Sequence, residues 1–101
     1  MQFIVTIGTE NTESMKPMKI LIIEDDFIIA NALKKELEKY EYDITLVEDF
    51  TKVMETFQKI EPHLVLLDIN LPHHNGYYWC SQIRAHSNVP IIFISSLSDK
   101  M

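Results

Sequence analysis

Two groups of acidic residues, each directly following a short apolar run, constrain this chain most. They are Glu24, Asp25 and Asp26 after residues 19–23, and Asp68 after residues 64–67. Each run is continuously apolar rather than alternating, which is typical of a buried parallel strand. Because the carboxyl ends of parallel strands meet at one edge of a sheet, we expect these carboxylates to share a crevice. Crowded carboxylates favour a hard divalent cation, and one of them is a candidate nucleophile toward a phosphoryl group.

The composition limits the class of protein. With 101 residues, 47% of them hydrophobic, the chain is expected to form one small globular domain. A net charge of −6 without a basic stripe argues against direct binding to nucleic acid. No apolar run is long enough to span a bilayer, so no membrane partner is expected. The single cysteine, Cys80, permits no internal disulfide and fits a reducing cytoplasm.

The apolar pattern alternates between strands and helices. Strands are predicted at residues 19–23, 43–47, 63–67 and 91–94, and helices at residues 27–40, 51–60 and 77–86. Asp26 is expected to cap the first helix, and Pro62 to stop the second. Such alternation predicts right-handed crossovers and a parallel sheet. Residues 1–17 are predicted to be an N-terminal appendage and residues 18–101 the domain itself.

Taken singly, each polar group has a simpler interpretation than a functional site. Asp25 and Asp26 suit a helix N-terminus, residues 68–72 suit a turn, and Ser95 suits a strand-end cap. Together they fall at the same predicted edge of the sheet, which favours the functional interpretation. The adjacent His73 and His74 are expected to be exposed loop residues rather than metal ligands.

The segments 19–26, 66–72 and 90–95, with Asn75-Gly76 between the last two, resemble the receiver domain of bacterial two-component response regulators. The resemblance runs from about Met18 to the end. It implies an α/β fold of the flavodoxin-like, doubly wound type with the strands in the order 2-1-3-4. The amino-acid sequence of these segments is similar to that of the OmpR/PhoB type. Within this type it is most similar to regulators that respond to peptide antibiotics and envelope stress.

The resemblance also implies a role for each matching residue. Asp68 is implied as the phosphoacceptor and Ser95 as a contact to the phosphoryl group. The implied ligands of Mg²⁺ are Asp25, Asp68, the backbone carbonyl of Asn70 and, through a bound water, Glu24. The implied partner is a sensor histidine kinase. The implied activity is that of a switch rather than a metabolic enzyme, acting on transcription through an effector domain absent here.

The chain departs from the family pattern after Ser95, because it stops six residues later, at Met101. The family's fourth helix, its fifth strand with a lysine and its last helix do not follow, and Lys100 is too near Ser95 to be that lysine. We therefore expect a truncated receiver whose open edge at residues 91–94 favours self-association. The alternatives are a kinase-binding decoy, a chain without a role, and a small Mg²⁺-dependent phosphatase. Asn70 disfavours the phosphatase, because such an enzyme needs a general acid two residues after the nucleophile, and Asn70 occupies that position.

Overall fold

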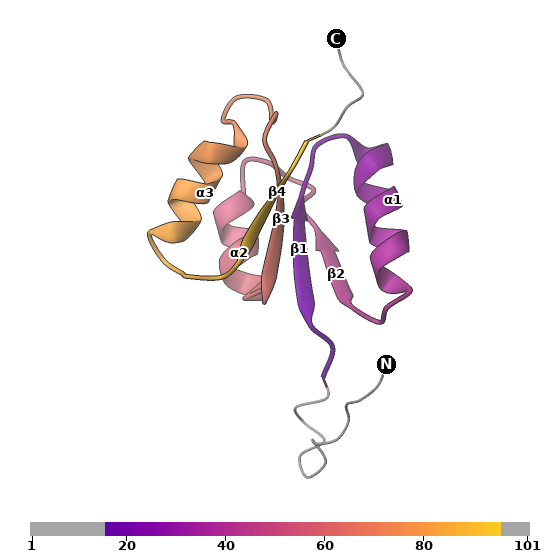
Figure 1. The fold of residues 1–101 in the computed structure, drawn as a ribbon. Helices are drawn as coiled ribbons and strands as arrows, with labels where there is room; N and C mark the ends of the chain where they lie inside the picture. The colour runs from indigo at the N-terminus through magenta and orange to yellow at the C-terminus, as the bar shows by residue number, and fades with distance from the viewer. Residues whose placement is uncertain (1–15, 96–101) are drawn as a thin grey trace.

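The computed structural model describes residues 16–95, which form a four-stranded parallel sheet with helices on both faces (Figure 1). The elements in chain order are β1 (Lys19–Ile23), α1 (Phe27–Glu38), β2 (Asp43–Leu46), α2 (Val53–Ile60), β3 (Leu64–Asp68), α3 (Gly76–Arg84) and β4 (Ile91–Ile94). The strands lie in the order β2-β1-β3-β4, and every neighbouring pair is parallel. The predicted fold class and strand order are therefore confirmed.

The sheet separates two hydrophobic clusters. Helix α1 covers one face, and helices α2 and α3 cover the other (Figure 1). Because successive side chains of a strand point to opposite faces, Ile20 and Ile22 pack on the α1 side, whereas Leu21 and Ile23 pack on the α2–α3 side. All four are buried. Strand β1 thus supplies both clusters, which explains its continuous apolar sequence.

The predicted boundaries were wrong by one or two residues at several ends. Helix α1 ends at Glu38 instead of residue 40. Helix α2 begins at Val53 instead of residue 51, because the Asp49 carboxylate holds the backbone N–H and hydroxyl of Thr51 in a preceding turn. Strand β3 extends to Asp68, and α3 begins already at Gly76. Periodicity does not detect local hydrogen bonds such as the one at the start of α3, where the Asn75 side chain accepts from the Tyr78 N–H.

The i, i+4 spacing of Ile29, Leu33 and Leu37 predicts one inward face for α1, and Leu33 and Leu37 do pack against the cluster on that side. All three are half-buried, and Ala30 is the one fully buried residue of the helix. A small side chain at this position lets the helix approach the sheet closely. On α2, Val53 and Phe57 are buried.

Several predictions fall outside the described residues. The predicted appendage is described only at Lys16 and Pro17, which are exposed, and Lys100 lies beyond the described part. No helix within residues 16–95 is long and apolar enough to cross a membrane.

Candidate phosphoryl and metal site

The carboxyl edge of the sheet brings together the three acidic residues that the sequence placed there. Glu24 and Asp25 follow β1, and Asp68 ends the adjacent strand β3, where Ile23 is paired with Leu67. One carboxylate oxygen from each acidic residue lies within 4.8 Å of the others. Glu24 and Asp68 are buried, and Asp25 is exposed. All the donors are oxygens, which suits Mg²⁺ or Ca²⁺ rather than a softer metal.

Glu24 is the most unusual member of the group. Its Oε2 accepts a hydrogen bond from the Asp26 backbone N–H at 2.9 Å, but its buried Oε1 has no partner among the described residues. The pKa of Glu24 is raised from 4.5 to about 7, mainly by burial and also by the negative charges of Asp68 and Asp25, while the hydrogen bond from the Asp26 N–H opposes the rise. A buried acceptor without a donor and an excess of negative charge both fit a bound cation.

Asp26 is close in sequence but has a separate task. Its Oδ1 accepts hydrogen bonds from the backbone N–H groups of Ile28 at 3.0 Å and Ile29 at 3.3 Å. It therefore caps α1, as predicted, and its backbone N–H orients Glu24.

Asp68 is held by the loop that follows it. Its Oδ1 accepts a hydrogen bond from the Asn70 backbone N–H at 3.1 Å. At the far end of the loop, the Gly76 N–H donates to the Ile69 carbonyl at 2.9 Å. A Cβ atom at Gly76 would lie only 2.4 Å from the Asp68 carbonyl oxygen, so only glycine permits this close approach.

Ser95 lies at the same edge, one residue beyond β4. In the β3–β4 pair Asp68 stands opposite Ile94, and the Ile69 N–H donates to the Ile94 carbonyl at 3.0 Å. Ser95 is therefore the next residue along the strand that flanks Asp68, and it is exposed. Its predicted contact with a phosphoryl group and the predicted use of the Asn70 carbonyl stay predictions.

The loop histidines and Cys80 have no place in this group. His73 and His74 are exposed, as predicted, but His74 also stacks on Tyr78 with ring centroids 3.9 Å apart. Cys80 is half-buried and packs against the hydrophobic cluster on the α3 side. Among residues 16–95, neither histidine is part of a group of three metal-binding side chains.

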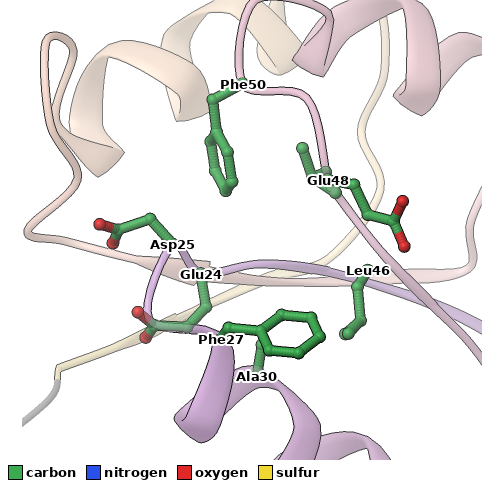
Figure 2. Close-up of a pocket in the computed structure, with 8 residues that line it drawn as sticks. Glu24, Asp25, Phe27, Ala30, Leu46, Glu48 and Phe50 are labelled. Atoms are coloured by element: carbon green, nitrogen blue, oxygen red, sulfur yellow. The ribbon is translucent and has the colours of Figure 1, made fainter.

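Sequence reasoning missed a cavity of about 360 Å³ beside the acidic group. Figure 2 shows the rings of Phe27 and Phe50 on opposite sides of it. Phe50 lies in the segment after β2, at the same edge of the sheet, and this position was the available signal.

The comparisons with known proteins agree with the geometry. The family model described as the response regulator receiver domain matches residues 20–101. This chain belongs to that family. It is 49% identical over 84 residues to the response regulator protein GraR of Staphylococcus epidermidis, an alignment that covers 83% of this chain. The chain spans 38% of the length of GraR.

Solved structures show the same relationship. The N-terminal domain of the nisin resistance regulator NsrR, a lantibiotic response regulator, superposes with a TM-score of 0.73 at 40% identity, covering 83% of this chain and 71% of that one. A chain from the complex of the histidine kinase ThkA with the response regulator TrrA matches with a TM-score of 0.71 at 29% identity. The match covers 81% of this chain and 72% of that one. The predicted likeness to regulators of peptide-antibiotic stress is confirmed by NsrR.

Proposed function

We propose that this receiver domain accepts a phosphoryl group on Asp68 and thereby acts as the switch of a two-component system. The observation that carries the proposal is the meeting of Glu24, Asp25 and Asp68 at the carboxyl edge of the sheet. Asp68 suits the role of acceptor because it ends a buried strand and is fixed by the Asn70 N–H. Its Oδ1 is turned toward the backbone, so we assign the attack to Oδ2.

The proposed cofactor is Mg²⁺. Asp25, Asp68 and the backbone carbonyl of Asn70 would hold it directly, and Glu24 would hold it through a bound water. The partnerless, buried Oε1 of Glu24 supports this assignment. When bound, Mg²⁺ would neutralise charge on the phosphoryl oxygens.

The proposed step transfers a phosphoryl group from a phosphohistidine. Asp68 Oδ2 forms a bond to phosphorus while the phosphorus–nitrogen bond of the donor breaks, and the electron pair of that bond leaves with the imidazole. The product is an acyl phosphate on Asp68. Ser95, one residue past the strand that flanks Asp68, would donate its hydroxyl hydrogen to a phosphoryl oxygen. Such a local contact can bias a loop between two states.

The proposed donor is a sensor histidine kinase, and the proposed location of this chain is the cytoplasm. In support, TrrA, which has the same fold, has been solved in complex with the histidine kinase ThkA. We propose that the phosphorylated domain controls transcription through an effector region outside this sequence. On this account the chain assists its own phosphorylation without being a metabolic enzyme.

The test is phosphorylation with a small donor. We expect incubation with acetyl phosphate and Mg²⁺ to add one phosphoryl group to the intact mass, and Asp68→Asn or chelation of Mg²⁺ to abolish the gain. Asp26→Asn is the matched control, because asparagine also caps helices and Asp26 lies outside the acidic group. An unchanged mass in a folded sample would contradict the proposal. Capture of the kinase without any mass gain would identify the decoy instead.

A further inference from the structure

We infer that the cavity between the start of α1 and the segment after β2 receives an arginine side chain of a partner protein. The cavity of about 360 Å³ is lined by Glu24, Asp25, Phe27, Ala30, Leu46, Val47, Glu48 and Phe50. Asp68 does not line it, so it is separate from the proposed acceptor although it shares two carboxylates with the acidic group. The inference does not require phosphorylation.

Charge selects a cation as the occupant. Three of the eight lining residues are acidic, and none is basic. Glu24 and Asp25 lie at one end of the cavity and Glu48 at the other, with the three carboxylates directed outward from the space between the rings (Figure 2). The net charge of −6 adds a favourable long-range potential for a basic partner. A bound metal at the Glu24 end would leave the Glu48 end available.

The aromatic walls select a flat cation that sheds its water easily. The rings of Phe27 and Phe50 lie on opposite sides of the cavity, with Leu46 beside the ring of Phe27 and Ala30 beneath it (Figure 2). A guanidinium group is planar, stacks on aromatic faces and is more weakly hydrated than an ammonium. Phe27 is 65% exposed although it is apolar, and a stacked arginine would cover its ring. A hydrated Mg²⁺ ion gains nothing from these walls.

The experiment uses a single arginine as the probe. We expect N-acetyl-arginine amide to shift the amide signals of residues 27–30 and 46–50 in ¹H–¹⁵N NMR spectra. The same amide of citrulline, which has nearly the same shape but no charge, is expected to leave them unchanged. Because Glu48 and the two rings provide the charge and stacking, Glu48→Gln and Phe50→Leu should each weaken binding about fivefold.

A matched variant separates this site from a general attraction. Tyr40 is 65% exposed, as Phe27 is, but lies beyond the far end of α1, so Tyr40→Leu should leave the arginine affinity unchanged. Equal shifts with citrulline, or equal weakening by Tyr40→Leu, would overturn the inference. Shifts confined to Asp68 and its neighbours would do the same, because they would show a counterion at the acidic group. Phe50→Leu should keep the acetyl phosphate mass gain, so the two proposals can fail separately.

Discussion

Glu24 is the residue on which the chemistry of the acidic group depends most. It is only 4% exposed, and one of its oxygens lacks a donor among the described residues. A carboxylate in this environment destabilises the fold unless it is protonated or neutralised by a cation. The same residue therefore links the pH, the bound metal and the stability of the domain.

We predict that the metal-free protein loses stability as the pH rises from about 4.5 to about 7. The pKa of Glu24 is 4.5 in the unfolded chain and about 7 in the folded one. The folded state thus holds the proton more tightly, and its advantage is lost as the pH passes through this window. The Glu24→Gln variant has no titrating group at this position. Above pH 7 its free energy of unfolding should therefore be about 1–3 kcal/mol higher than that of the wild type.

Chemical denaturation at several pH values, with EDTA and then with Mg²⁺, measures this effect. Near pH 4.5 the two proteins should be similarly stable. Addition of Mg²⁺ above pH 7 should stabilise the wild type more than Glu24→Gln. A stability difference that does not change with pH would contradict the role given to Glu24.

At the level of elements, the junction between β3 and α3 positions Asp68. Gly76 begins α3 directly against the end of β3, where an added Cβ would lie 2.4 Å from the Asp68 carbonyl oxygen. We predict that Gly76→Ala lowers the free energy of unfolding by about 1–3 kcal/mol, because backbone must move to relieve the contact. It should also slow phosphorylation by acetyl phosphate.

Thermal melts followed by circular dichroism, with phosphorylation rates alongside, measure both effects. Ser81→Ala is the control, because Ser81 is an exposed position of the same helix and its change should stay within about 0.5 kcal/mol. If Gly76→Ala behaved like Ser81→Ala, the close approach of the two elements would not be important.

The elements also show what the sequence can and cannot predict. The strands and the capping role of Asp26 were predictable, because continuous apolar runs and cap chemistry are local signals. The cavity gives no such local signal, since Phe27 and Phe50 come from different segments, and only their shared place at the carboxyl edge of the sheet could have indicated it. The partnerless oxygen of Glu24 was equally hidden, because it depends on how the turn before α1 directs one carboxyl group.

For the molecule as a whole, the sheet edge at β4 is the exposed feature. Within residues 16–95, β4 pairs only with β3, and Ile92 is 51% exposed. We propose that the 101-residue chain by itself associates with a second copy through this edge. Ile92→Lys should abolish the association, because a charged edge resists pairing.

Sedimentation velocity over a range of protein concentrations measures the association. Ile28→Lys is the control, because Ile28 is 81% exposed but lies on α1. It should still associate as the wild type does. A wild-type chain that stays monomeric at every concentration and melts cooperatively would contradict the proposal.

The most direct test of the central claim finds the phosphorylated residue itself. Borohydride reduces an acyl phosphate to an alcohol, so an aspartyl phosphate becomes homoserine. After treatment with acetyl phosphate and Mg²⁺, then borohydride, peptide mass spectrometry should find homoserine at position 68 alone. Homoserine at Asp25 or Asp26 instead, or phosphate retained on a serine or histidine, would contradict the assignment of Asp68 as the acceptor.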